Sequence, residues 1–329
     1  MQLPDVSVLT AAQQFIEMNQ PFWLCTIINT YGSAPRPIGS IFITDGEKRY
    51  GSISGGCLED GFVKMLSENH FTKQNQLFTY GKHLQDEHIV RELPCGGTIE
   101  LLIEYVLPTT ENFAHFSQWL ALVNAKQALH RSVKLSTQTR QVSDSTNQQR
   151  LSTTVEKTET TVTCHYQQIL QLLIIGVGSV SEHVARLGIQ SGYDVKVCDM
   201  RKDLANSWHL NDNDDGSPIY WASPDNFVEQ YANANTAVLA LAHDPRLDDV
   251  ALMEAFNSDA FYIGAMGSIR TTQARIERLQ RICQVSEQAL TRLHAPIGLN
   301  IGSKTPMEIA IAIMADVLRC QRGIAKSEL

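Results

Sequence analysis

The sequence predicts an α/β protein with two parts: a smaller mixed α/β domain in the first half and, in the second half, a parallel sheet with helices on both faces. Its 329 residues are enough for two ordinary domains. Between residues 132 and 163, Ser, Thr and Gln dominate and large hydrophobic residues become scarce. After this stretch, apolar strand-like runs alternate with helical runs, which is typical of a parallel sheet covered by helices. We therefore expect domains at 1–130 and 168–329, with 131–167 either a linker or a pair of exposed strands such as 160–166.

The first half predicts helices and strands in mixed order. Residues 5–19 repeat apolar side chains at helical spacing on one face. Asp45-Gly46 is a hairpin dipeptide that separates two β-rich runs. From these patterns we expect strands at 22–30, 40–44, 48–54, 76–80 and 98–106, and further helices at 58–69 and 111–125.

The second half predicts a regular alternation. We expect strands at 171–175, 194–198, 236–242 and 260–263, helices at 180–190, 225–232, 247–256 and 271–280, and one more element at 286–293. The closing helix is well signalled, because Thr305 is an N-cap, Pro306 takes the first turn and Glu308 completes a capping box. Residues 309–314 are apolar all round, which predicts burial in a core or an interface.

Composition excludes several classes of protein. The net charge of -8 argues against a sequence-independent nucleic-acid binder, which needs a basic surface. No apolar run reaches the roughly 18 residues of a membrane span, and residues 1–35 contain no Lys or Arg, so we expect neither a membrane anchor nor a secretory signal. The seven cysteines are an odd count without a Cys-x-x-Cys pair, which favours reduced thiols in the cytoplasm.

A glycine-rich turn in the second half predicts a phosphate-binding loop. A buried strand leads into Gly176-x-Gly178 and then into a helix, with the small Ser181 at the third glycine position. Asp199 ends the next strand, where an acid can bond a ribose hydroxyl. Arg201 could instead accept a phosphate or stack on a base. The pattern predicts Rossmann topology and either NAD(P) or another nucleotide as ligand, or a structural loop without one.

Two cysteines in the first half stand in mirror-image settings, Gly55-Gly56-Cys57 and Cys95-Gly96-Gly97. Glycine beside a thiol lets backbone approach the sulfur or its ligand closely. Cys57 precedes a predicted helix, whose N-terminus stabilises a thiolate or a phosphate. Each cysteine is therefore either a nucleophile or sulfur carrier, or a small buried residue at a tight turn. Glu59 and Asp60 read as ordinary helix-start acids.

Other polar residues flank these motifs. Arg36 lies in a stiff loop between two prolines and offers a guanidinium suited to a phosphate or a carbonyl-rich ring. His83 and His88 precede Cys95, but the spacing matches no structural zinc pattern, so we predict no metal. In the second half, His243, Gly264, Gly267 and Ser268 follow two predicted strands and would line the edge at which parallel sheets bind ligands.

These motifs together resemble a known family. Gly32-Ser-Ala-Pro-Arg-Pro, the stretch from Ser54 to Glu59 and Cys95-Gly-Gly are similar to the amino-terminal domain of the XdhC/CoxI family. The segments from Leu173 to Gly178, 199–201, 242–246, 262–268 and 294–299 are similar to that family's Rossmann domain. The resemblance spans nearly the whole chain except its Ser/Thr/Gln-rich middle.

The resemblance implies a cytosolic chaperone that binds the molybdenum cofactor (molybdopterin), supports its sulfuration and inserts it into an apo molybdenum hydroxylase of the xanthine dehydrogenase type. A cysteine desulfurase is the implied sulfur donor. The resemblance singles out Cys57 and Cys95 for cofactor or sulfur contact, with Arg36, Ser54, Gly55, Gly56, Gly96 and Gly97 around them. An accessory protein is thus expected rather than a turnover enzyme, with a homodimer plausible from its apolar last helix.

Two other functions stay open. One is an NAD(P)-dependent oxidoreductase with His243 as acid/base and structural thiols. The other is a redox- or metal-sensing protein without turnover.

Overall fold

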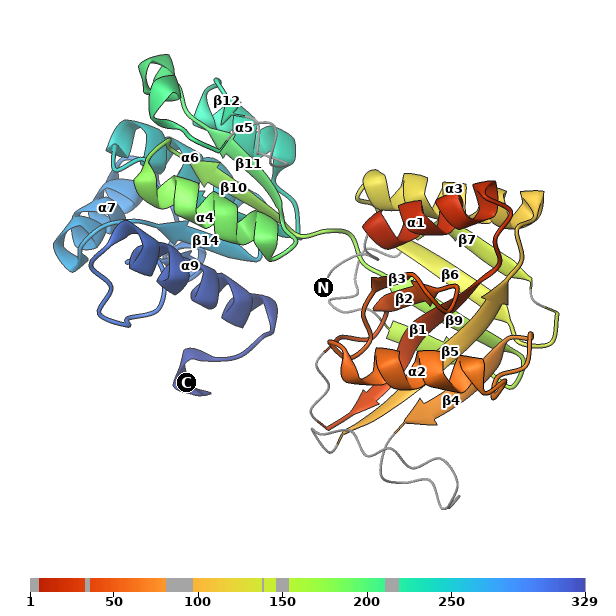
Figure 1. Ribbon diagram of the computed structural model, residues 1–329. Coiled ribbons are helices and arrows are strands. Elements are labelled where there is room, and N and C mark those ends of the chain that lie inside the picture. The colour runs from red at the N-terminus through yellow and green to blue at the C-terminus, as the bar shows by residue number, and fades with distance from the viewer. Residues whose placement is uncertain are drawn as a thin grey trace. The chain divides into compact units, whose positions relative to one another are not determined.

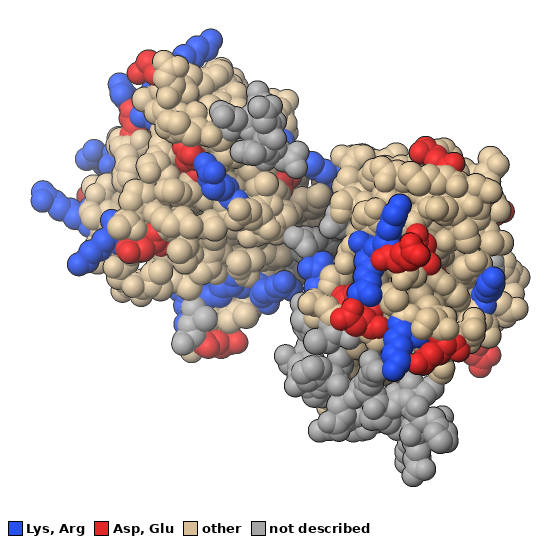
Figure 2. Space-filling view, in the orientation of Figure 1, with Lys and Arg blue, Asp and Glu red and all other residues tan. Residues whose placement is uncertain are grey.

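The computed structural model describes residues 6–32, 36–80, 97–137, 139–145, 154–210 and 219–328. The chain divides into two compact units, Met1–Ile169 and Leu170–Leu329, and each has its own sheets and helices (Figure 1). On the face shown in Figure 2, Lys and Arg side chains are interspersed with Asp and Glu rather than gathered into one basic stripe. Within the described part of the chain, every helix is too short or too polar to cross a bilayer.

The first unit combines two antiparallel sheets with three helices. Its five-stranded sheet has the order β3-β2-β1-β5-β4 and its four-stranded sheet the order β7-β6-β9-β8. The helices are α1 (Val6–Glu17), α2 (Cys57–Ser67) and α3 (Thr110–Asn124). The strands are β1 (Phe22–Tyr31), β2 (Ile41–Thr44), β3 (Arg49–Gly51), β4 (Gln76–Tyr80), β5 (Thr98–Val106), β6 (Leu129–Lys134), β7 (Arg140–Asp144), β8 (Thr154–Lys157) and β9 (Thr161–Tyr166).

The strands β1, β2 and β5 of the five-stranded sheet are largely buried on both faces, because most of their residues are apolar. On one face, Cys25 and Ile103 pack with Phe62 of α2. On the other face, Leu24 and Leu102 belong to a core that also contains α1, α3 and the four-stranded sheet. The alternation of side chains along each strand thus feeds two separate cores.

The segment 131–167 forms strands rather than a linker, and these strands are not simply exposed. Val162, Cys164 and Tyr166 alternate inward along β9 and join the core that contains Trp119, whose side chain is fully buried. The Ser and Thr residues occupy the opposite face of the same strands. Composition averaged over both faces hides this pattern. Because these strands join the core of the first unit, that unit extends to Ile169.

The second unit is a parallel sheet with the order β12-β11-β10-β13-β14-β15, which confirms the predicted topology. Helices α4 and α9 pack on one face, and α5, α6 and α7 on the other (Figure 1). The strands are β10 (Gln171–Ile175), β11 (Asp194–Cys198), β12 (Ile219–Tyr220), β13 (Thr236–Ala240), β14 (Tyr262–Ala265) and β15 (Leu293–His294). The helices are α4 (Ser179–Gln190), α5 (Pro224–Tyr231), α6 (Pro245–Asn257), α7 (Ile269–Arg281), α8 (Glu287–Leu290) and α9 (Pro306–Gln321), with short 3-10 turns η1 (Lys202–Ser207) and η3 (Lys326–Glu328).

The last helix begins as the sequence predicts. Thr305 accepts the Glu308 N–H, and the Glu308 side chain accepts the Thr305 N–H, so the capping box is complete. The apolar stretch of α9 is buried on one side only, because Ile313 is fully buried whereas Ile311 is 46% exposed.

Candidate functional site

The glycine motifs of the first unit lie at one end of its five-stranded sheet. Tyr31 at the end of β1 pairs with Thr98 at the start of β5, so Gly97 lies beside the loop that follows β1. A Cβ added to Gly32 would lie only 3.4 Å from the Gly97 Cα. Strand β3 ends in the same direction, since Gly51 pairs with Phe42 at the start of β2. The register therefore brings the Arg36 loop, the Gly55-Gly56 loop and Gly97 to a common edge.

Glu59 organises the Gly55-Gly56 loop. Its carboxylate accepts hydrogen bonds from the backbone N–H groups of Ile53, Ser54 and Gly56 and from the hydroxyls of Ser52 and Ser54. Burial raises the pKa of Glu59, but the hydrogen bonds from Ser54 and Ser52 outweigh it and lower the pKa to about 2. Glu59 is only 5% exposed. Glu59 is a first-turn acid of α2, as expected, but it also holds the loop that precedes the helix.

The two glycines of this loop adopt a backbone that few other residues tolerate. Gly55 has φ +86° and Gly56 has φ +134°, and no atom of the described residues lies within 4 Å of a Cβ added to either. Their bare backbone therefore borders open space.

Helix α2 begins at Cys57, one residue earlier than predicted, with Gly56 as its N-cap. Part of the helix N-terminus is already occupied, because Ser54 Oγ accepts the Leu58 N–H at 2.9 Å. The carboxylate of Glu59 also balances part of the partial positive charge there. The Cys57 side chain lies outside what the structure describes, as do Cys95, Gly96, His83 and His88.

Arg36 carries a buried nitrogen without a partner among the described residues. Its Nε is shielded from solvent and has no hydrogen-bond partner among the residues described. An unpaired buried N–H costs about 1–3 kcal/mol, more when it is charged. An anion bound at this edge of the sheet would supply the missing acceptor.

The glycine loop of the second unit contains two glycines with different requirements. Gly176 has φ +102°, and a Cβ there would lie 2.3 Å from the Ala242 Cα, so the protein itself excludes any larger residue. Gly178 has φ 175° and nothing within 4 Å of an added Cβ. The open space at Gly178 fits a phosphate approaching the N-terminus of α4. Ser181 is buried in α4, as expected of a small residue at a helix–strand contact.

Asp199 is engaged within the protein. It is fully buried, and its Oδ2 accepts the Val177 N–H at 2.7 Å. Arg201 donates to the same carboxylate through Nε and Nη2 at 3.0 and 2.7 Å. Burial raises the pKa of Asp199, but the hydrogen bonds from Arg201 and Val177 outweigh it and lower the pKa. In this arrangement Asp199 braces the glycine loop, and a ribose would compete with Arg201 for it.

Several residues predicted to line the carboxyl edge of the sheet have structural partners. A Cβ on Gly264 would lie 2.5 Å from the Ile297 side chain, and one on Gly267 would lie 3.3 Å from Thr271. Ser268 is the N-cap of α7 and accepts the Thr271 N–H. His243 differs, because it is exposed and has φ +58°, a strained value that is common near functional sites.

A buried ion pair that the sequence analysis did not identify holds this edge. Asp248 Oδ1 accepts the Ala242 N–H, and its Oδ2 accepts Arg275 Nη2, both at 3.0 Å. Arg275 also donates to the Met266 carbonyl at 3.0 Å. The pair therefore links the turns after β13 and β14, which carry His243 and Gly267.

Comparison with known proteins accounts for both halves of this arrangement. The family model described as the XdhC Rossmann domain matches residues 172–317, and the model of the XdhC and CoxI family matches residues 15–81. The chain is a member of the XdhC and CoxI family.

Relatives of this family resemble the chain over most of its length. The Escherichia coli K12 protein named molybdenum cofactor insertion chaperone PaoD is 24% identical over 296 residues, covering 89% of this chain and 81% of that protein. A Bacillus subtilis 168 protein, named as a probable component of xanthine dehydrogenase, is 21% identical over 344 residues, covering 96% and 98%. A crystal structure titled as a xanthine dehydrogenase from Bacillus halodurans, 21% identical, superposes with a TM-score of 0.72 over 98% of this chain and 97% of that chain. This last likeness establishes the shared fold.

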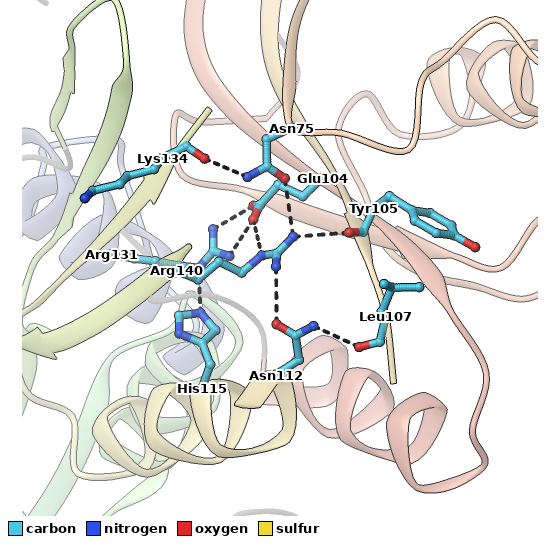
Figure 3. Close-up of polar contacts among 9 residues, drawn as sticks. All are labelled: Asn75, Glu104, Tyr105, Leu107, Asn112, His115, Arg131, Lys134 and Arg140. Atoms are coloured by element: carbon cyan, nitrogen blue, oxygen red, sulfur yellow. Dashed lines mark hydrogen bonds and ion pairs between the residues drawn. The ribbon is translucent and has the colours of Figure 1, made fainter. Parts of the chain in front are cut away.

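The first unit of this XdhC and CoxI family member also contains a buried charge network (Figure 3). Glu104 of β5 forms a bidentate pair with Arg131 at 2.8 and 2.9 Å and a third contact with Arg140 at 2.7 Å. Arg131 Nε donates to His115 Nε2 at 3.1 Å. Burial raises the pKa of Glu104, but the charges of Arg131 and Arg140 outweigh it and lower the pKa to about 2, whereas burial lowers the pKa of His115 to about 3.

The network ties the two sheets of the first unit together and borders a cavity of about 410 Å³. The cavity is lined by residues of α3, β6 and β7, among them His115, His130 and Arg140. The sequence analysis missed it because most of β6 and all of β7 fall in the segment 131–167, which was expected to be a linker or exposed strands. The available signal was the even spacing of Leu129, Val133 and Leu135, which Arg131 interrupts.

Proposed function

We propose that the chain binds the molybdenum cofactor and delivers it to an apo molybdenum hydroxylase of the xanthine dehydrogenase type. The observation that carries the proposal is the end of the five-stranded sheet, toward which the strand register directs both Arg36 and the bare backbone of Gly55 and Gly56. The name of the PaoD relative, which matches 89% of the chain, points to the same cargo.

The residues at this edge suit a phosphorylated pterin. Arg36 offers a buried Nε without a partner among the described residues, and a phosphate or ring carbonyl would accept from it. The Glu59 contacts hold the Gly55-Gly56 backbone in place before cargo arrives, which lowers the entropic cost of binding. Cys57 and Cys95 are the proposed soft contacts to the dithiolene or to sulfur.

The second unit is proposed to bind a nucleotide, either NAD(P) or a nucleotide carried by the cofactor. Gly178 and the N-terminus of α4 would hold its phosphates, with Arg201 near the ribose. Support for sulfuration, with a cysteine desulfurase as donor, belongs to the same proposal, as do a homodimer and a cytoplasmic location.

The first test is the small molecule carried by the full chain purified anaerobically from its own cell. We expect a pterin that Arg36→Ala releases and that Arg49→Ala retains. Arg49 is a matched control because it is a partly exposed arginine on the neighbouring β3 strand, paired with Asp60. Absence of pterin from the wild-type chain, together with tight NAD(P) binding and hydride transfer, would instead support an oxidoreductase.

The second test is activation of an apo molybdenum hydroxylase. Cys57→Ala and Cys95→Ala should keep the thermal unfolding midpoint of the wild-type chain but abolish activation, whereas the control Cys283→Ala should activate normally. Full activation by both variants would contradict the role proposed for these thiols.

A further inference from the structure

A second group of reactive side chains lies inside the second unit, on α9 and β15. His294 Nδ1 is 3.2 Å from Asp316 Oδ2, and His294 Nε2 faces Cys320 Sγ at 3.8 Å. Thiol, imidazole and carboxylate thus follow one another in the order found in nucleophile–base–acid triads. Cys320 lies beyond residue 317, where the match to the family's Rossmann domain ends.

The carboxylate determines which nitrogen of His294 carries the proton. Burial raises the pKa of Asp316, but hydrogen bonds from His294, Arg319 and Tyr262 outweigh it and keep the pKa below its usual range. An ionised Asp316 accepts the Nδ1–H, which leaves the lone pair of Nε2 directed at the thiol. The Tyr262 ring stacks on the imidazole at a centroid distance of 4.2 Å and fixes its plane.

The surrounding cations disfavour a metal ion at this site. Arg319 Nη2 lies 2.9 Å from Cys320 Sγ, and Arg319 Nε donates to Asp316 Oδ1 at 2.8 Å. Lys326 of the C-terminal turn lies 3.9 Å from Asp316. A divalent cation placed among His294, Asp316 and Cys320 would meet both of these cations, and the carboxylate already accepts from its neighbours. The same cations stabilise negative charge on sulfur.

The thiol is sheltered at rest but reachable. Burial raises the pKa of Cys320, with the Arg319 charge opposing it, so the thiol stays protonated until a base removes its proton. Its exposure is intermediate, and the His294 side chain is 21% exposed. Among the cysteines whose surroundings are described, Cys25, Cys164 and Cys198 are buried, and Cys283 and Cys320 alone have intermediate exposure.

We propose that Cys320 is a nucleophilic thiol that exchanges with sulfur–sulfur bonds, using His294 as its base and Asp316 as a positioning residue. The substrate is a disulfide or a persulfide. The residues of this site belong to the second unit, whereas those proposed to hold the cofactor belong to the first.

The exchange balances without an added oxidant. His294 Nε2 takes the proton from Cys320 Sγ, and the thiolate attacks one sulfur of the S–S bond. A new S–S bond forms to Cys320 as the old one breaks, and its electron pair leaves with the second sulfur. That leaving thiolate takes the proton back from His294. A disulfide thus yields a mixed disulfide and a thiol, and a persulfide attacked at its outer sulfur yields a Cys320 persulfide and a thiol.

The test incubates the full chain with glutathione disulfide in one arm and glutathione persulfide in the other, and follows each cysteine by peptide mass spectrometry. We expect an adduct at Cys320 in at least one arm, and the arm that gives it identifies the substrate as a disulfide or a persulfide. His294→Gln should slow formation of this adduct by about 100-fold. Cys283 is the internal control, because Asp249 and Arg278 are the charges that act on it. An unmodified Cys320 in both arms, or an equal rate in His294→Gln, overturns the proposal.

Asp316→Asn separates positioning from simple support of the fold. Loss of the correct imidazole tautomer slows modification of Cys320. Structural loosening alone would expose the thiol and speed its modification, together with a lower unfolding midpoint. Stoichiometric zinc binding that Cys320→Ser removes, without any sulfur adduct on the wild-type chain, would also overturn the proposal in favour of a metal site.

Discussion

Two glycine loops in this molecule lead into a helix, and a buried carboxylate braces each of them. In the first unit, Glu59 belongs to the helix itself and is held by N–H and O–H dipoles of the loop. In the second unit, Asp199 comes from the neighbouring strand and is paired with the guanidinium of Arg201. The negative charge of Glu59 is therefore stabilised by dipoles, whereas the guanidinium of Arg201 neutralises the charge of Asp199.

The glycines of the two loops also differ in what requires them. Gly55 and Gly56 need their positive φ, but nothing crowds them. Glycine is required at position 176 for two reasons: its φ is positive, and Ala242 leaves no room for a Cβ. Neither reason applies to Gly178. Where neither φ nor packing requires a glycine, close approach of a ligand to the backbone is the remaining reason for it. Gly178 is in this respect the best indicator of a ligand in the second unit.

The largest effect is expected at Gly176. Gly176→Ala places a Cβ 2.3 Å from backbone of Ala242 at a strained φ, and should cost about 4 kcal/mol or more in the free energy of unfolding. Chemical denaturation of the full chain, with hydrogen exchange of peptides from β10 and β13, measures this loss. A variant with wild-type stability would mean that the two chain segments separate more easily than their packing indicates.

The second largest loss of stability is expected for Glu59→Gln. Glu59→Gln keeps the shape of the side chain but removes the charge, so the N–H groups of Ile53, Ser54 and Gly56 lose a strong acceptor at a cost of about 2–3 kcal/mol. Hydrogen exchange in residues 52–58 should rise. Asp60→Asn is the matched control, because Asp60 is the next residue of α2 and its side chain is 74% exposed. Equal effects of the two substitutions would show that Glu59 acts only through the helix dipole.

The charge on Glu59 also predicts a response to acid. Because folding lowers the pKa of Glu59 to about 2, its stabilisation is fully present above the ordinary carboxyl range and is lost as the pH falls toward 2. The unfolding free energy of the wild-type chain should therefore fall more steeply between about pH 4.5 and 2 than that of Glu59→Gln. The pKa of Glu104 is lowered in both the wild-type chain and Glu59→Gln, so its contribution cancels when the two stability curves are subtracted. Parallel curves would contradict the assigned pKa.

The smallest effect on stability is expected at Gly178. Gly178→Ala meets open space at an extended φ, so the unfolding free energy should change by less than about 0.5 kcal/mol. The same substitution should weaken nucleotide binding at least tenfold, measured by calorimetry with the nucleotide recovered from the purified chain. Unchanged binding would mean that the loop serves the fold alone.

Local pattern was sufficient for much of the fold. Strands β10 and β11 have the predicted bounds because β10 is mostly apolar, β11 alternates polar with apolar residues, and both lie between turn signals. The start of α9 followed from Thr305 and Glu308, which interact within one helical turn. Strands β6 to β8 were the weak point, because each is short and has polar residues on one face, whereas β9 was among the expected strands.

The sequence by itself determined the two-part organisation, the parallel sheet and the glycine motifs, because these depend on residues that are neighbours along the chain. Only the tertiary structure decided which acids act on which loops. Glu59 and Asp60 are adjacent in sequence, yet one is buried beneath a loop and the other faces solvent. His294, Asp316 and Cys320 meet only because β15 and α9 pack together, and contacts across such distances follow from packing rather than from local sequence.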